Sequence, residues 1–156
     1  MKKIRSTEKH KHTTKKTFAP STIAYGHGEC ARYWYLAFDG QMFEDNADAY
    51  ASANMTAGTL SHARIQNAMM NAGIVKVYRD DDNEPTTEFK IRHDDPPIFG
   101  YGDVMFDWQG QELIGEIKTM MNEGFEYRKA SGKAKNGHLM QLLIYMKILK
   151  RPTGVM

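Results

Sequence analysis

Residues 101–118 read YGDVMFDWQGQELIGEIK, and we expect this stretch to form the centre of the fold. Apolar residues run on both sides of Gln109-Gly110-Gln111, a pattern that is typical of two strands joined by a tight turn. The strands are expected at residues 100–108 and 112–119, paired as an antiparallel hairpin. A longer loop would shift the pairing by about one or two residues without separating the strands.

The hairpin brings three ionisable side chains together. With a two-residue turn, Asp103 lies opposite Glu116, and directly opposed residues have their Cβ atoms about 4.5 to 5.5 Å apart. Lys118 follows Glu116 at the second position and therefore points to the same face of its strand. Two carboxylates this close repel each other, and a hard divalent cation such as Mg²⁺ relieves that repulsion.

Two interpretations of this group remain open. In the first, a divalent cation activates water and Lys118 stabilises the charge that builds on a phosphoryl group, which is the chemistry of phosphodiester hydrolysis. In the second, the two acids and Lys118 form an ion pair across an exposed strand face. Spacing alone does not separate the two.

The flanking sequence predicts further elements, which are listed in chain order: a helix over 21–38, interrupted near Gly26 and Gly28; a helix over 56–72, which Gly73 ends; strands at 74–79 and 86–92, paired across an acidic turn; a polar, basic connection over 128–137; and an apolar helix over 139–149. Helices, then strands, then a helix predict an α/β fold with a central mixed sheet flanked by helices.

Composition limits the class of protein. A chain of 156 residues that is 41% hydrophobic predicts one domain with one core. The apolar runs are much shorter than the roughly 20 residues of a membrane-spanning helix, so we expect no membrane partner. The lysine-rich start is no secretory signal, and we expect a cytoplasmic protein. Cys30 is the only cysteine, which excludes an internal disulfide and an iron-sulfur cluster.

Charge is distributed unevenly along the chain. Residues 1–16 hold seven basic residues and one acidic residue, whereas the remaining 140 residues hold 14 basic and 18 acidic residues. We therefore expect residues 1–17 to be a basic, disordered tail and residues 18–156 to be the folded domain. The tail is either an arm that binds a polyanion such as DNA or a solubilising leader.

Other candidate residues lie outside the hairpin. His62, on the apolar face of its helix, is either a metal ligand or a core histidine bonded to a backbone carbonyl. Gln141 and Tyr145 are four residues apart, so both project to one side of the last helix, next to His138. They are either part of the site or a packed tyrosine beside a solvated glutamine.

Four basic residues follow the hairpin before the last helix, namely Arg128, Lys129, Lys133 and Lys135. A run of this kind contacts the phosphates of a nucleic acid or is only a solvated linker.

Taken together and in this order, these residues resemble the RecB-like branch of the PD-(D/E)xK nuclease superfamily, which includes bacteriophage exonucleases and the nucleases of CRISPR adaptation. The resemblance covers about residues 20 to 150. Its pieces are the segments Gly58-Thr59-Leu60-Ser61-His62, Gly102-Asp103, Glu116-Ile117-Lys118 and Gln141-Leu142-Leu143-Ile144-Tyr145. It implies a restriction-endonuclease-like core.

The resemblance also implies roles for these residues. Mg²⁺ or Mn²⁺ would be held by His62, Asp103, Glu116 and the carbonyl of Ile117. Lys118 would assist the attacking water, and Gln141 with Tyr145 would support the site or the DNA strand.

The implied activity is hydrolysis of DNA in phage or mobile-element processing. An exonuclease is expected first, and an endonuclease or junction-cleaving enzyme second. The rival expectations are a non-catalytic DNA-binding module and a subunit whose sheet is completed by a partner chain, either a second copy or another protein.

The chain departs from the family pattern in two places. Many relatives close an iron-sulfur cluster with three further cysteines, which this chain lacks, so Cys30 is either a relic or a packing residue. Many relatives also continue into further strands, whereas this chain stops at Val155-Met156, where a strand is expected to begin. Either the domain is minimal or the chain is a fragment truncated at its C-terminal end.

Overall fold

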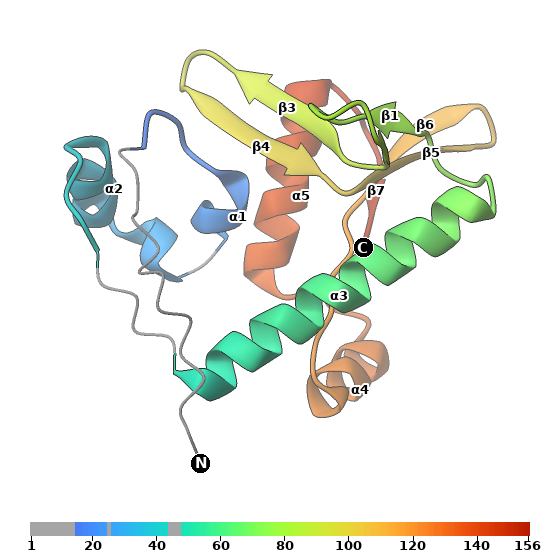
Figure 1. Cartoon of the computed structure of the whole chain (residues 1–156), viewed down its shortest axis with the longest axis horizontal. Helices are drawn as coiled ribbons and strands as arrows, with labels where there is room; N and C mark the ends of the chain where they lie inside the picture. The colour runs from blue at the N-terminus through green and yellow to red at the C-terminus, as the bar shows by residue number, and fades with distance from the viewer. Residues whose placement is uncertain (1–14, 25, 44–47) are drawn as a thin grey trace.

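The computed structural model describes residues 15–24, 26–43 and 48–156, and its helices and strands form an α/β fold (Figure 1). A three-stranded sheet has the order β5-β6-β7, with β5 at Val104–Trp108, β6 at Gln111–Gly115 and β7 at Gly154–Val155. The β5–β6 pair is antiparallel and the β6–β7 pair is parallel. This confirms the expected α/β class with a mixed sheet and flanking helices.

The β5–β6 hairpin has the expected register. Val104 pairs with Gly115 and Trp108 pairs with Gln111, which leaves Gln109 and Gly110 as the two-residue turn. Both turn residues have positive φ, 54° and 78°, as a hairpin turn matched to the strand twist requires.

The outer ends of this hairpin differ from the expectation. The run expected as one strand over 100–108 is divided at Asp103, and the strand expected over 112–119 ends at Gly115. The N–H of Glu116 still donates to the carbonyl of Val155 in β7, and residues 117–119 then leave the sheet, because the chain turns here toward a helix that the sequence pattern did not indicate. The break at Asp103 leaves that residue at the junction of two hairpins.

Two more hairpins precede the sheet. Strand β3, Phe89–His93, pairs antiparallel with β4, Ile98–Gly102, and β1, Tyr78–Arg79, pairs with β2, Pro85–Thr86. The expected pairing of 74–79 with 86–92 was therefore wrong except beside the turn, where Tyr78 pairs with Thr86. The turn at 94–97 brings the neighbouring strand β4 alongside β3, and a local partner needs less loop closure than a distant one.

The N-terminal helical region is broken as expected. It consists of α1, Pro20–Ile23, a 3₁₀ turn at Gly26–Glu29, and α2, Ala31–Phe38. A Cβ on Gly28 would lie 2.1 Å from the carbonyl oxygen of Thr22, so only glycine fits between the turn and α1. Residues 1–14 of the expected tail lie outside the described residues. The chain is packed from Lys15, whose backbone N–H donates to the carbonyl of Ala37.

Helix α3, Ala49–Asn71, begins earlier than the expected start at residue 56. Asp48 caps it by accepting a hydrogen bond from the N–H of Ala51 at 2.7 Å, and an alanine-rich first turn favours helix without an apolar pattern. The expected end is confirmed, since Gly73 follows with φ of 67°. None of the residues of α3 is buried.

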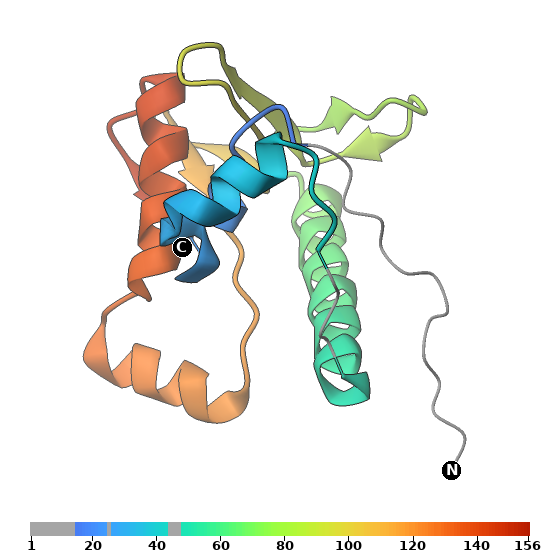
Figure 2. The same ribbon diagram turned by 90° about the vertical axis from the view of Figure 1, so that its left-hand side faces the viewer.

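A helix that was not expected, α4, covers Asn122–Ser131 and includes the first part of the connection predicted over 128–137. Helix-forming residues, an acid in its first turn and two bases in its last turn favour it. Because none of its residues is buried, it has no apolar periodicity that sequence reasoning can detect. Helices α3 and α4 both project from the sheet-bearing body (Figure 2).

Helix α5, Asn136–Leu149, supplies the helical part of the core. It contacts β3, β6 and β7, and its Leu142 and Tyr145 are buried. The buried cluster between helix and strands consists of Phe89, Ile91, Met105, Ile114, Leu142 and Tyr145. Across the described ranges, no helix is both long enough and apolar enough to cross a bilayer.

Candidate active site

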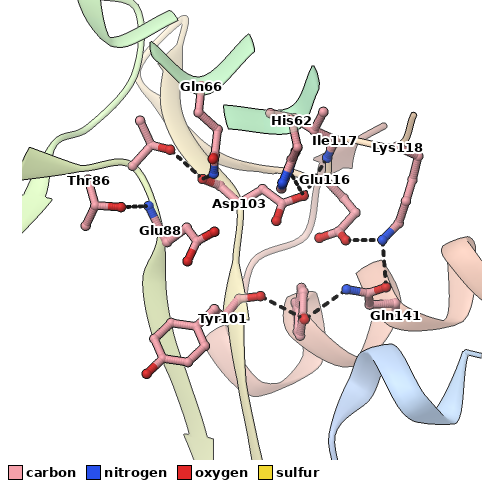
Figure 3. A network of polar contacts seen from close by, with 12 residues as sticks. His62, Gln66, Thr86, Glu88, Tyr101, Asp103, Glu116, Ile117, Lys118 and Gln141 are labelled. Atoms are coloured by element: carbon pink, nitrogen blue, oxygen red, sulfur yellow. Dashed lines mark hydrogen bonds and ion pairs between the residues drawn. The ribbon is translucent and has the colours of Figure 1, made fainter. Parts of the chain in front are cut away.

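Polar side chains from four separate parts of the chain meet where β4 and β6 end and β5 begins (Figure 3). Asp103 lies between β4 and β5, Glu116 and Lys118 follow β6, His62 comes from α3, and Gln141 comes from α5. The structure therefore brings together the residues that the sequence selected for the metal and the water.

Asp103 is held rigidly. Its side chain is largely buried, and Oδ2 accepts a hydrogen bond from the N–H of Ile117 at 2.7 Å. Its backbone carbonyl accepts hydrogen bonds from Thr87 Oγ1 at 2.9 Å and Gln66 Nε2 at 3.2 Å. Gly102 matters to this placement, because a Cβ there would lie 2.3 Å from the ring of Phe89.

Glu116 is the most buried acid of the site, with 3% of the residue exposed. Its Oε1 lies 2.6 Å from Lys118 Nζ, whereas its buried Oε2 has no hydrogen-bond partner among the described residues. Burial and the neighbouring Asp103 raise the pKa of Glu116 to about 7, although Lys118 and His62 oppose the shift. The expected two-carboxylate environment is thus present, and Lys118 pairs with only one of the two oxygens of Glu116.

A chain of hydrogen bonds fixes Lys118. Its ammonium donates to Gln141 Oε1 at 2.9 Å, and Gln141 Nε2 donates to Tyr145 Oη at 3.0 Å. Tyr145 Oη in turn donates to the backbone carbonyl of Tyr101 at 2.9 Å. Burial raises the pKa of Tyr145 above its usual range, so the hydroxyl stays a donor. Gln141 and Tyr145 are therefore positioning residues behind the lysine.

His62 faces the acids from α3. Its Nε2 lies 3.2 Å from Asp103 Oδ2, and that contact raises the pKa of the imidazole while partial burial lowers it. The expectation that His62 lies on an apolar face packed inward was only partly right. Its helix buries no residue, and the neighbouring Ile65 is 36% exposed. The histidine is drawn inward by Asp103 and not by a hydrophobic core.

Sequence reasoning missed Glu88, which lies between β2 and β3. Ligand atoms of His62, Glu88 and Asp103 all lie within 4.8 Å of one another, and no other such group of His, Cys, Asp or Glu occurs among the described residues. Glu116 is outside this group. A lone acid before a strand carries no local pattern, so only a correct prediction of the β3–β4 pairing would have found it.

The four basic residues are not part of the carboxylate cluster. Arg128 and Lys129 end α4, and Lys133 and Lys135 lie in the loop before α5. Arg128 and Lys135 line a cavity of about 550 Å³ between α1 and the start of α5.

Two of these cations, Arg128 and Lys135, act on His138, as Lys118 does. Burial lowers the pKa of His138, and Lys118, Lys135 and Arg128 lower it further through their positive charge. Positive charge from Lys118, Lys135 and Arg128 therefore acts on His138, near the start of α5.

Cys30 does not take part in this site. It is exposed and precedes α2 as its N-terminal cap residue, without a side-chain capping bond. The expectation that Cys30 is a packing residue is therefore wrong.

The donor set suits a divalent cation. Carboxylate and carbonyl oxygens are the ligands of Mg²⁺ and Mn²⁺, and a neutral imidazole is tolerated by Mn²⁺. The unpartnered oxygen of Glu116 fits an expected ligand, and the N–H of Ile117, bonded to Asp103, fixes the chain next to it. Comparison of the chain with family models, with curated proteins and with solved structures finds no match.

Proposed function

We propose that the protein is a divalent-metal-dependent DNA nuclease that hydrolyses phosphodiester bonds with Mg²⁺ or Mn²⁺. The observation that carries this proposal is Glu116. Lys118 binds one oxygen of this buried carboxylate, and leaving the other oxygen without a partner is costly unless a further group, such as a metal ion, binds it. Asp103 and His62 lie beside it, and all three point into one polar cluster.

The protein residues divide the chemical work. His62, Asp103, Glu116 and the carbonyl of Ile117 would hold the cation, which supplies Lewis acidity and lowers the pKa of bound water. Lys118 directs its ammonium toward the same place and stabilises negative charge on the phosphoryl oxygens. The hydrogen bonds behind it reduce the reorganisation that this stabilisation needs.

In this proposal the basic residues bind the DNA. Arg128, Lys129, Lys133 and Lys135 contact backbone phosphates, and two of them, Arg128 and Lys135, act together with Lys118 on His138. The resemblance to RecB-like nucleases favours DNA as the polymer and an exonuclease of a phage or mobile element. That enzyme would act in the cytoplasm of a host cell. An endonuclease or junction-cleaving enzyme is the second choice.

The rival is a DNA-binding module or subunit without catalysis. A binding surface gains nothing from Asp103 and Glu116, because both acids repel the phosphates of a polyanion. Lys118 is partly buried and its ammonium is held by both Glu116 and Gln141, whereas a lysine that only contacts phosphates needs neither bond.

One assay tests the proposal. Linear and circular DNA are incubated with the full chain in Mg²⁺, in Mn²⁺ and in EDTA, and the products are separated on a gel. We expect cleavage in either metal and none in EDTA, with loss of linear DNA alone for an exonuclease. Asp103→Asn should be inactive, and Asp82→Asn, in the exposed β1–β2 turn, is the matched control. Metal-independent cleavage or an active Asp103→Asn would refute the proposal.

A further inference from the structure

The β3–β4 hairpin has a buried face and an open face. Phe89 and Ile91 of β3 belong to the buried cluster and lie on the first face. Side chains alternate along a strand, so Lys90 and Arg92 point to the opposite face. Both are exposed there.

Two aromatic residues share this open face. Tyr101 pairs with Lys90, and Phe99 pairs with Arg92, and directly opposed residues point to the same side of the sheet. The ring centroids of Phe99 and Tyr101 lie 5.3 Å apart in an edge-to-face arrangement. The side chain of Tyr101 is not covered by the fold, since 41% of the residue is exposed. The open face therefore presents aromatic surface to the solvent.

A cavity of about 510 Å³ adjoins this surface, and its lining includes Tyr101, Lys90 and Glu88. That volume is within the range of about 300 to 1,000 Å³ that is usual for small-ligand pockets. Glu88 also belongs to the carboxylate cluster, because ligand atoms of Glu88, Asp103 and His62 lie within 4.8 Å of one another. The cavity therefore lies next to the candidate active site.

The backbone fixes Tyr101 relative to that site. Its carbonyl accepts the hydrogen bond of Tyr145 Oη at 2.9 Å, and Asp103 follows two residues later, about 7 Å further along the chain. In Figure 3 the ring of Tyr101 extends toward the strand that follows Glu88, while the carbonyl points the opposite way. The ring is thus held beside the residues proposed to act on the phosphodiester bond.

The charges of the cavity favour a neutral ligand. Its lining holds two cations and three acids, namely Arg79, Lys90, Asp80, Asp81 and Glu88. Lys90 is already paired with Asp81, so the acids would repel a phosphate. A nucleobase carries no charge, its amino groups can donate to carboxylates, and its flat face stacks on an aromatic ring.

We propose that this cavity binds one unpaired base of the DNA, stacked on Tyr101, beside the bond that is cleaved. A base inside a duplex is paired and stacked on its neighbours, so it cannot enter. This inference rests on the proposed function and names its substrate, which is an unpaired DNA strand.

The test compares two forms of DNA. A short fluorescent single strand and the blunt duplex of the same sequence are titrated with the full chain in Ca²⁺, and binding is followed by fluorescence anisotropy. The wild type should bind the single strand more tightly. Tyr101→Thr, which keeps a residue suited to a strand but removes the ring, should weaken single-strand binding by about 5- to 100-fold and leave duplex binding unchanged.

Two further variants separate stacking from a general loss of structure. Tyr101→Phe keeps the ring and should bind the single strand like the wild type. Tyr35→Ala removes another exposed tyrosine, on α2, and is the matched control, which should also bind normally. Circular dichroism confirms that each variant is folded, and Tyr101→Leu repeats the measurement if Tyr101→Thr is not.

The outcomes distinguish this inference from the proposed function. A duplex bound as tightly as the single strand, or a folded Tyr101→Thr that binds the single strand normally, would overturn the base-binding cavity, and metal-dependent cleavage would still leave the nuclease intact. A single-strand preference that depends on Tyr101, without cleavage in Mg²⁺ or Mn²⁺, would support the cavity and refute the nuclease. No binding of either DNA would overturn the cavity, and the cleavage assay would decide the proposed function by itself.

Discussion

The sheet with α5 and the pair of helices α3 and α4 differ in how they are held. The first contains a buried cluster of strand and helix residues, whereas neither α3 nor α4 buries a single residue. The candidate site spans both, because Asp103, Glu116 and Gln141 belong to the buried part and His62 belongs to α3. Two side chains of α3, His62 and Gln66, bind Asp103 itself. The polar cluster therefore also attaches the exposed helix α3 to the sheet.

The largest effect is expected inside the buried part. Glu116→Gln and Asp103→Asn each remove a charged ligand at nearly constant shape, so metal-dependent cleavage should fall by at least about 1000-fold. DNA binding, measured by fluorescence anisotropy in Ca²⁺, should survive. Cleavage by either variant at the parental rate in Mg²⁺ would show that the buried carboxylates are structural.

Lys118→Ala should lower turnover by about 100- to 1000-fold while metal affinity changes little, because the ammonium acts on transition-state charge. Lys118→Arg should not restore turnover, since a planar guanidinium does not replace a compact ammonium bound to both Glu116 and Gln141. Single-turnover kinetics and Mn²⁺ titration measure the two quantities. Normal turnover in Lys118→Ala would reduce this lysine to an ordinary ion pair.

A third prediction concerns the exposed helix. A cation that binds both His62 and Asp103 joins α3 to the sheet, so Mn²⁺ should increase the hydrogen-exchange protection of α3. His62→Ala should abolish that increase and raise the Mn²⁺ concentration needed for half-maximal activity by about 10- to 100-fold. Excess Mn²⁺ should partly restore activity. His93→Ala, an exposed histidine at the end of β3, is the control.

If His62 is instead a structural residue, its replacement should lower the melting temperature and leave metal dependence unchanged. Binding also requires the neutral imidazole, and Asp103 raises the pKa of His62. Mn²⁺ affinity should therefore fall as the pH decreases through the titration range of His62.

The pH dependence of metal-free stability tests the burial of Glu116. Its pKa is about 7 in the folded chain and near 4.5 when exposed, so the folded state binds the proton more tightly. The resulting stabilisation is present at low pH and is lost as the pH rises from 4.5 to 7.

Glu116→Gln should therefore be more stable than the wild type at pH 8 in EDTA, by about 1 to 3 kcal/mol, and similar to it at pH 4. Urea unfolding at both pH values measures the difference. Equal stabilities at pH 8 would mean that Glu116 ionises without cost in the folded chain.

The smallest effect is expected from the N-terminal tail. Deleting residues 1–14, which keeps the contact between Lys15 and α2, should weaken DNA affinity several-fold and reduce its salt dependence. Turnover at saturating DNA should not change. A chain with the basic residues of 1–14 replaced by Gln separates charge from length. An unchanged slope of log affinity against log salt concentration would show that the tail does not bind DNA and is only a solubilising leader.

Local chemistry explains what could be predicted from the sequence. The turn at Gln109 and Gly110 sets the β5–β6 register by itself, and helical spacing alone places Gln141 beside Tyr145. The α/β class and the meeting of Asp103, Glu116 and Lys118 follow from such short-range patterns. Helix α4 was not predicted because an exposed helix needs no apolar periodicity. The start of α3 was placed too late because it depends on the cap at Asp48.

Tertiary packing decided the rest. Glu88 becomes part of the site only through the β3–β4 pairing, and His62 faces Asp103 from a helix that buries nothing. The pKa of Glu116 is raised mainly because neighbouring parts of the fold bury its carboxyl group away from water. Spacing along a chain specifies which side chains share a face, but desolvation and charge compensation depend on neighbours that are distant in sequence. Which of the selected residues are buried, paired or left without a partner was therefore determined by the folded structure alone.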